Sequence, residues 1–209
     1  MLKILKTPAL IVAAALGLSA CATPFDVSRD APFDVTPVIE AQTQDWSITG
    51  VDIDVPRSLT VSEANSIKPR SDIVWRGEPL GDRYQQVDDL MTAALLPVLT
   101  PRESGATPVI VSLDVTRFHA VTERARYTIG GEHEIEFNVT VRHAETGQIL
   151  SGPRSVDLTF RALGGRQAIE SEAQGLTQRV RITQRLQEWA RAEFPAPYGD
   201  FVTVAEFAN

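Results

Sequence analysis

Three histidines are the first side chains in this sequence that could do chemistry as metal ligands. His119, His133 and His143 all fall on or beside predicted strands, and strand pairing could bring His119 near His133. Protein metal sites commonly combine such histidines with cysteines or with a second histidine at a short local spacing. The chain has no HxH or HxxxH spacing and only one cysteine, far from all three. We therefore expect three ordinary exposed histidines, no metal site and no cofactor.

Three carboxylates follow one another at a spacing of two. Glu132, Glu134 and Glu136 would project to one face of a strand. A hydrolase could use such groups if one carboxyl had a raised pKa in a cleft. Here they form the polar half of a strict alternation, which favours a solvated sheet face. The nucleophile elbow, HExxH and GxGxxG motifs are all absent from the sequence, so we expect no enzymatic activity and no catalytic residue.

The segment 77–83 (Gly-Glu-Pro-Leu-Gly-Asp-Arg) lies between a predicted strand and a predicted helix. The N-terminus of a helix can bind anions. However, the Lys-Ser/Thr pair of a phosphate-binding loop is missing, and Glu78 and Asp82 would repel phosphate. The segment is therefore interpreted as a tight turn with an acidic helix cap. Together with Trp75 it has the most unusual local composition in the chain, so we place the predicted partner surface there.

The first 21 residues have the pattern of an exported protein. Lys3 and Lys6 give a positive start, and residues 7–17 are almost wholly apolar, a stretch too short to cross a bilayer, which needs ~20 residues. Small residues then lead to Leu18-Ser19-Ala20-Cys21. This segment resembles the lipobox of bacterial lipoproteins at all four positions. The alternative is an ordinary secretory signal followed by an incidental cysteine.

The lipobox resemblance implies that Cys21 is a lipid attachment site. In that family the thiol receives a diacylglycerol, the signal is cut before the cysteine, and the new amino group can be acylated. Each buried methylene contributes ~0.8 kcal/mol, so two or three acyl chains would hold the protein on a membrane durably. Cys21 is the only cysteine, so no intramolecular disulfide competes for it. Ala22 follows it instead of the Asp associated with inner-membrane retention, which implies the outer membrane.

Net charge argues against a nucleic acid partner, and chain length indicates the number of domains. Removal of residues 1–20 takes away two lysines and no acid, which leaves 18 basic and 27 acidic residues and a net charge of −9. Such an acidic protein has little electrostatic reason to bind nucleic acid. The remaining 189 residues suit one domain. We expect a signal peptide over 1–20, a lipidated tether over 21–45 and a single periplasmic domain over 46–209.

The tether contains a short repeat. Pro-Phe-Asp-Val occurs at 24–27 and again at 32–35. The repeat could be a docking motif for a partner, a chance recurrence, or a segment that packs on its own domain, and the last two readings are favoured.

Hydrophobic periodicity predicts the elements of the domain. Asp82 and Gln85 have the spacing of a capping box at the start of the first helix. A turn is expected at 144–147. The tail 198–207, rich in aromatics and valine, is expected to pack on the domain. The predicted strands cover 48–55, 59–61, 72–76, 109–121, 134–142 and 156–161, and the predicted helices cover 82–96 and 166–193. The predicted fold class is α+β, an antiparallel sheet with a meander and two helices packed on one face.

The predicted function follows from anchor and fold together. We expect an outer-membrane, periplasm-facing lipoprotein that acts as a binding or assembly accessory with an envelope protein partner. The sequence indicates no particular small-molecule ligand. The chain is similar to uncharacterised proteobacterial lipoproteins, most clearly over 72–87 (DIVWRGEPLGDRYQQV). Its order of elements is also similar to lipoproteins that serve as auxiliary subunits of ABC-type lipid transport or lipopolysaccharide export. This alternative predicts an apolar groove between helix and sheet.

Overall fold

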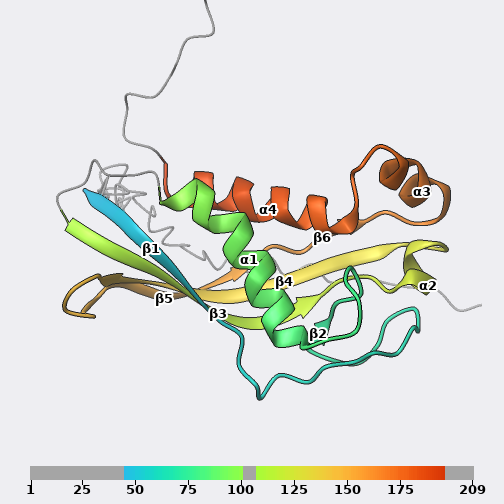
Figure 1. Ribbon diagram of the computed structural model, residues 1–209, viewed down its shortest axis with the longest axis horizontal. Helices are drawn as coiled ribbons and strands as arrows, with labels where there is room; N and C mark the ends of the chain where they lie inside the picture. The colour runs from blue at the N-terminus through green and yellow to red at the C-terminus, as the bar shows by residue number, and fades with distance from the viewer. Residues whose placement is uncertain (1–44, 101–106, 196–209) are drawn as a thin grey trace, which may run out of the picture. The chain divides into compact units, whose positions relative to one another are not determined.

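The computed structural model describes residues 45–100 and 107–195, which form six strands and four helices (Figure 1). The signal segment, Cys21, the Pro-Phe-Asp-Val repeat and the tail 198–207 lie outside the described residues. The strands are β1 (Trp46–Asp54), β2 (Ile73–Val74), β3 (Thr107–His119), β4 (Gly131–His143), β5 (Ile149–Asp157) and β6 (Phe160–Ala162). The helices are α1 (Arg83–Leu99), α2 (Glu123–Arg126), α3 (Gly165–Ala173) and α4 (Gln178–Glu193).

The sheet is mixed, with the strand order β1-β3-β4-β5. β3, β4 and β5 pair antiparallel, so the predicted meander is confirmed. β1 and β2, however, both pair parallel with β3, and the expectation of a purely antiparallel sheet is wrong. Parallel neighbours need a crossover connection, and α1 supplies it between β2 and β3. The α+β class itself is confirmed.

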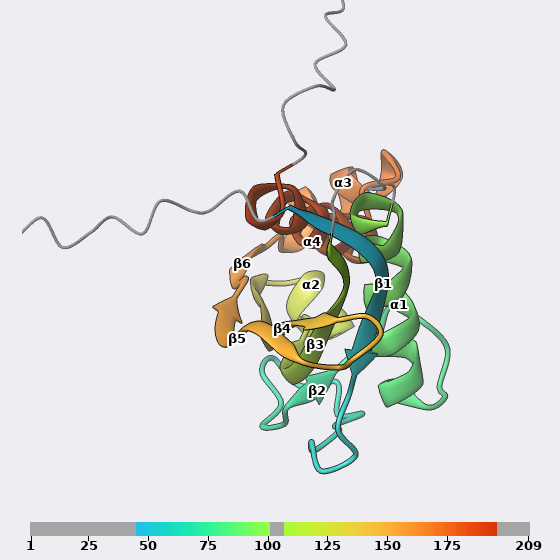
Figure 2. The ribbon, with the colours of Figure 1, turned by 90° about the vertical axis from the view of Figure 1, so that its left-hand side faces the viewer.

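One face of this sheet carries the hydrophobic core. Alternate residues of β3 and β4 point to it, as their period of two predicts. Helices α1 and α4 add their apolar sides to the same cluster and contact one another (Figure 2). Burial of each large apolar side chain contributes roughly 1.5–3 kcal/mol. The buried core residues of these four elements are Val109, Val111, Leu113, Val115, Ile135, Phe137, Val139, Val141, Val87, Leu90, Met91, Ala94, Leu95, Leu99, Ile182, Leu186 and Ala190.

Helix α1 begins as the sequence predicts and ends later. The Asp82 side chain accepts hydrogen bonds from the backbone N–H groups of Tyr84 (3.1 Å) and Gln85 (3.3 Å). The Gln85 side chain donates to Asp89 four residues on, so only the Asp82 half of the capping box is formed. The helix continues past Pro97 to Leu99, which is fully buried and anchors the last turn in the core.

The single long helix predicted over 166–193 is wrong, because the chain breaks it into α3 and α4. Gly175 has a φ of +80°, which L residues with a side chain rarely adopt. Thr177 then caps α4, its hydroxyl accepting from the Val180 backbone N–H at 3.4 Å. The break turns the second half of the predicted helix toward the core and leaves α3 beside α2 at the end of the sheet (Figure 1).

Two smaller elements also differ from the sequence prediction. The strand expected over 156–161 covers only the end of β5, which begins at Ile149, and the start of β6. The two strands are separate because the Asp157 side chain accepts from the Thr159 backbone N–H (2.8 Å) and turns the chain. The connection between β3 and β4 contains the short helix α2, capped by Thr122, which periodicity cannot detect in four residues.

Candidate functional site

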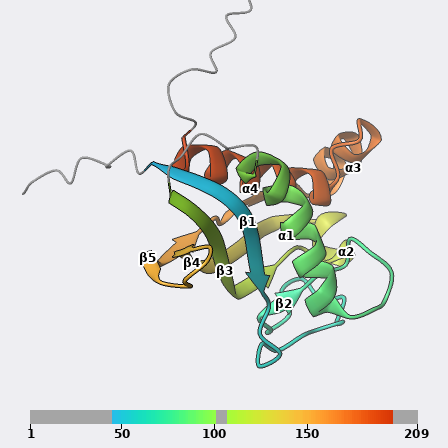
Figure 3. The ribbon, with the colours of Figure 1, turned by 60° about the vertical axis from the view of Figure 1, so that its left-hand side comes forward.

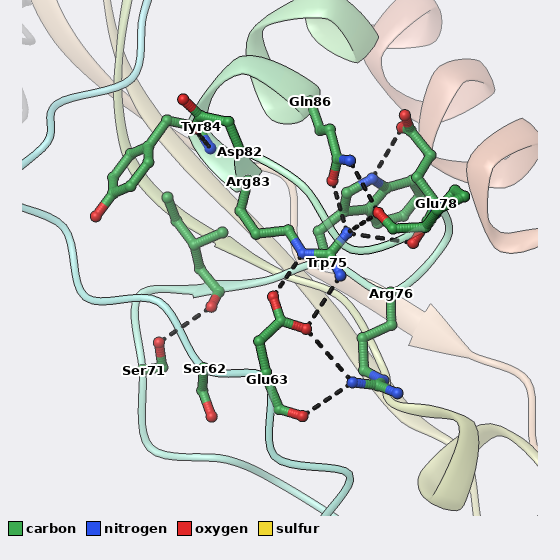
Figure 4. A network of polar contacts seen from close by, with 12 residues as sticks. Ser62, Glu63, Ser71, Trp75, Arg76, Glu78, Asp82, Arg83, Tyr84 and Gln86 are labelled. Carbon is green, nitrogen blue, oxygen red and sulfur yellow. Dashed lines mark hydrogen bonds and ion pairs between the residues drawn. The ribbon is translucent and has the colours of Figure 1, made fainter.

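A network of charged side chains organises the loops before α1 (Figure 4). Its centre is Arg83, which is 4% exposed. The Arg83 guanidinium holds Glu63 in a bidentate pair, with Nε donating to Oε1 at 2.6 Å and Nη2 donating to Oε2 at 3.0 Å. Arginine suits this position because its planar guanidinium carries five N–H donors in a fixed geometry. The pair fastens a loop to the first turn of α1.

The same guanidinium also fixes the 77–81 loop. Arg83 Nη1 donates to the carbonyls of Glu78 (3.2 Å) and Pro79 (3.1 Å) and to Gln86 Oε1 (2.6 Å). The Glu78 carboxylate in turn accepts from Trp75 Nε1 and from Arg179 Nη1, both at 3.0 Å. The backbone and the one acidic side chain of this loop are therefore both held by groups from other elements.

Trp75 explains why a glycine begins the loop. The indole is 1% exposed and meets Phe118 edge-on with ring centroids 5.8 Å apart. A Cβ on Gly77 would lie 2.3 Å from the Trp75 ring, closer than any side chain can approach. Gly77 thus lets the backbone pass close to the indole face, and the buried Trp75 ring limits the conformation of the loop.

Arg76 extends the network to α2. Its Nη1 donates to the Glu63 carbonyl at 2.9 Å, and its Nε is paired with Glu123. The hydrogen bond from Arg83 lowers the pKa of Glu63, and the pairing with Glu123 raises the pKa of Arg76. Each charged side chain of the network is paired with one of opposite sign, so the network holds the loops in place.

Leu80 is the part of this loop that faces solvent. It is 78% exposed at the centre of the segment that Arg83 and Trp75 hold. The predicted acidic cap is confirmed at Asp82, which also pairs with Arg57 at the surface (2.7 Å). The segment therefore presents one apolar side chain on a fixed backbone.

The expectation of three exposed histidines is wrong for two of them. His119 is 3% exposed and His133 is 1% exposed. His133 shares the inward phase of β4 with Ile135 and packs on Phe160 with ring centroids 4.9 Å apart. His119 ends β3 with its Nε2 3.0 Å from the Pro69 carbonyl. His143 is half-buried, and the described residues contain no cluster of three side chains able to hold a metal ion.

The three carboxylates of β4 do occupy the outward phase, as predicted, with unequal exposure. Glu132 is exposed, whereas Glu134 is 13% exposed and pairs with Lys68 and with Arg117 (2.6 Å). Burial raises the pKa of Glu134, but the hydrogen bonds from Lys68 and Arg117 outweigh it and hold the pKa below its usual value. Glu134 is therefore a charged partner of two cations and not a general acid. An open hollow beside it is lined by Thr60, Lys68, Pro69, Arg70, Ser71, Asp72 and Arg117.

The lowered pKa of Glu63 predicts a pH-dependent stability. A carboxyl whose pKa is lower in the folded state stabilises the fold above its ordinary pKa of 4.5 and loses this contribution as pH falls through the folded value. A Glu63→Gln variant should thus be less stable than the wild type at pH 7, and the difference should shrink below pH 4.5. Urea unfolding across this range measures it. A difference that is constant down to pH 3 would contradict the assignment.

No helix in the described part of the chain is long and apolar enough to cross a membrane. None of the curated proteins matches the chain. Among solved structures, a Xanthomonas campestris protein of the family DUF330 is similar at 12% identity and a TM-score of 0.42, over 71% of this chain and 81% of that one. An uncharacterised protein is similar at 19% identity and a TM-score of 0.34, over 72% and 93%. A candidate lipoprotein from Caulobacter crescentus is similar at 19% identity and a TM-score of 0.25, over 52% and 85%.

The match to a protein family is broader. It runs from residue 46, where β1 begins, to residue 207, and so takes in every described strand and helix. The chain belongs to the family of unknown function DUF6778.

Proposed function

We propose that this chain is a lipid-anchored, periplasm-facing protein of the outer membrane whose domain acts as a binding or assembly accessory for an envelope protein. The lipobox at 18–21 supports the anchor, and Ala22 supports the outer membrane. The start of β1 at Trp46 leaves 25 residues from Cys21 to Asp45 as a tether. The proposal gives the domain a binding role and no catalytic one, with no nucleic acid partner.

The observation that carries the binding role is the position of the most exposed apolar side chains. Trp46 and Phe194 pack together at one end of the domain, with ring centroids 6.5 Å apart, where β1 begins and α4 ends (Figure 3). Leu80 and Ile129 are 78% and 75% exposed. Both belong to connections at the opposite end, near β2 and α2 (Figure 1). The two most exposed apolar side chains therefore belong to connections at the end of the domain opposite to the start of β1.

Leu80 has the properties of a binding contact. A large exposed apolar side chain gains free energy when a partner covers it, and a backbone already fixed loses little entropy on binding. The loop carbonyls on the N-terminal side of Leu80 are held by Arg83, as described above. The Arg83 network thus serves the proposed contact without touching the partner.

The alternative role in lipid transport needs an apolar groove between helix and sheet. In the described residues that interface is filled, since Leu90 and Leu95 of α1 and Ile182 and Leu186 of α4 are at most 1% exposed. The open hollow beside Glu134 is lined mainly by polar side chains. These observations favour protein binding over lipid handling.

Site-specific photocrosslinking in intact cells tests the binding role. A photoreactive amino acid at position 80 or 129 is expected to give one discrete adduct with an envelope protein. The matched control is position 149 in β5, an isoleucine that is 49% exposed at the end of the sheet where β1 begins. Equal adducts from 80, 129 and 149, or adducts from 149 alone, would contradict the proposed surface.

A further inference from the structure

A small, partly open chamber lies where β4 and β6 meet α2, α3 and the start of α4. Its volume is about 10 Å³. It shares no residue with the Arg83 network. The sequence does not predict the chamber, because it depends on the break at Gly175 that separates α3 from α4, whereas periodicity predicted one continuous helix over 166–193. The chamber is lined by Val121, Arg126, His133, Leu163, Ala168, Ser171, Glu172, Leu176, Gln178 and Arg181.

Polar atoms in the chamber wall have no protein partner. Gln178 is 5% exposed, and neither its Nε2 nor its Oε1 has a hydrogen bond. His133 is 1% exposed, and its Nδ1 is likewise without a partner. Buried polar groups in proteins are nearly always satisfied by protein or by ordered water. The NH₂ group and the carbonyl oxygen of the Gln178 amide, together with an imidazole nitrogen, therefore require a further hydrogen-bonding group in this place.

We infer that the chamber is a binding site for one water molecule, which hydrogen-bonds His133 of β4 and Gln178 of α4. A cavity needs roughly 10–15 Å³ of this measure to hold a water, and the water needs two to four polar partners. The chamber meets both conditions. A water both donates and accepts, so it can satisfy the two ends of the Gln178 amide, which a monatomic ion cannot do.

The chamber lining has one cation in excess, so an anion is the occupant that the test must distinguish from water. Glu172 Oε1 lies 3.2 Å from Arg126 Nε and meets the Arg126 charge, although Nε makes no hydrogen bond. Arg181 donates to the Arg161 carbonyl at 3.0 Å. Burial, and then the charges of Arg181 and Arg126, lower the pKa of His133 to about 3. The imidazole is therefore neutral at pH 7, and its Nδ1 accepts or donates according to tautomer. Water fits either case.

The water joins the sheet to the first turn of α4 at the point where α3 closes over both. Gln178 is the first residue of α4, directly after the Thr177 cap. His133 lies in β4 opposite Phe160 of β6. Neither side chain reaches the other through a direct hydrogen bond in the structure, so hydration links two elements that packing alone brings together.

Substitution of Gln178 by the similarly sized Met tests the inference by the sign of its effect. If the water is present, Gln178→Met removes two of its partners and leaves His133 Nδ1 unsatisfied, so the midpoint of thermal unfolding of the full chain should fall. If the chamber is dry, the same change removes two unsatisfied polar atoms and the midpoint should rise, which would overturn the inference. Gln184→Met, at an exposed position of the same helix, is the matched control and should leave the midpoint unchanged.

Nuclear magnetic resonance of the wild-type full chain in detergent micelles gives a second readout that needs no variant to fold. The Gln178 side-chain NH₂ group is expected to show a cross-peak to water with the sign of a long-lived bound molecule. Its absence, with the cross-peaks of exposed Gln184 as the reference for fast-exchanging water, would overturn the inference. A bromide ion found in the chamber of crystals grown in sodium bromide would also overturn it, because the site would then be an anion site.

Discussion

A Cys21→Ala variant is expected to lose lipid labelling completely and to leave the washed membrane fraction. The cysteine is the only residue of the chain that can carry a thioether-linked lipid. Two or three acyl chains bind a bilayer durably, at ~0.8 kcal/mol for each buried methylene, whereas the domain itself is acidic and has no electrostatic attraction to anionic lipid. Incorporation of labelled palmitate and fractionation after a carbonate wash measure the two effects.

The control for the anchor experiment is the stability of the folded domain. Because Cys21 lies 25 residues before β1, its replacement should leave the urea unfolding midpoint of the domain unchanged. A Ser28→Ala variant, a matched small change within the tether, should keep both palmitate and membrane association. Palmitate incorporation that persists in Cys21→Ala would show that the lipobox assignment is wrong, whatever the fractionation shows.

Local signals in the sequence predicted the parts of the fold that depend on them. A period of two identifies β3 and β4, because the alternation directly reports one buried face. Only the last two residues of β5 fall within a predicted strand, because most of β5 is exposed and does not alternate. It carries no information on strand direction, and so β1 and β2 were wrongly expected to run antiparallel. Likewise, the pattern of apolar residues over 166–193 continues across Gly175, but the helix ends before it. A positive φ at a single residue is enough to end a helix.

The candidate site was predicted only where its contacts are short in sequence. Asp82 caps α1 through residues two and three positions away, so its role follows from spacing. Arg83 binds Glu63 twenty positions away across an irregular loop, and no periodicity connects the two. The burial of His119 was missed for the same reason, because its partner, the Pro69 carbonyl, is fifty positions earlier.

Arg83→Met is expected to destabilise the domain by about 3 kcal/mol, since removal of one partner of a buried ion pair costs 3–5 kcal/mol and Glu63, half-exposed, recovers some solvation. Methionine keeps the length of the stem and removes every hydrogen bond to Glu63, Glu78, Pro79 and Gln86. Urea unfolding measures the loss.

Arg57→Met is the matched control, because Arg57 also forms a bidentate pair with a carboxylate, Asp82, but at the surface. Its side chain is 66% exposed, and pairs of this kind contribute about 0–1 kcal/mol. The two variants also test whether the Arg83 network is needed for the proposed contact at Leu80. Arg83→Met should lower the yield of the crosslinked adduct from position 80, because the loop that carries this position then loses the hydrogen bonds from Arg83 to its carbonyls. Arg57→Met should leave the yield unchanged. Equal stabilities for the two variants would mean that Arg83 does not organise the loop, and an unchanged adduct in Arg83→Met would mean that the partner does not depend on a fixed Leu80.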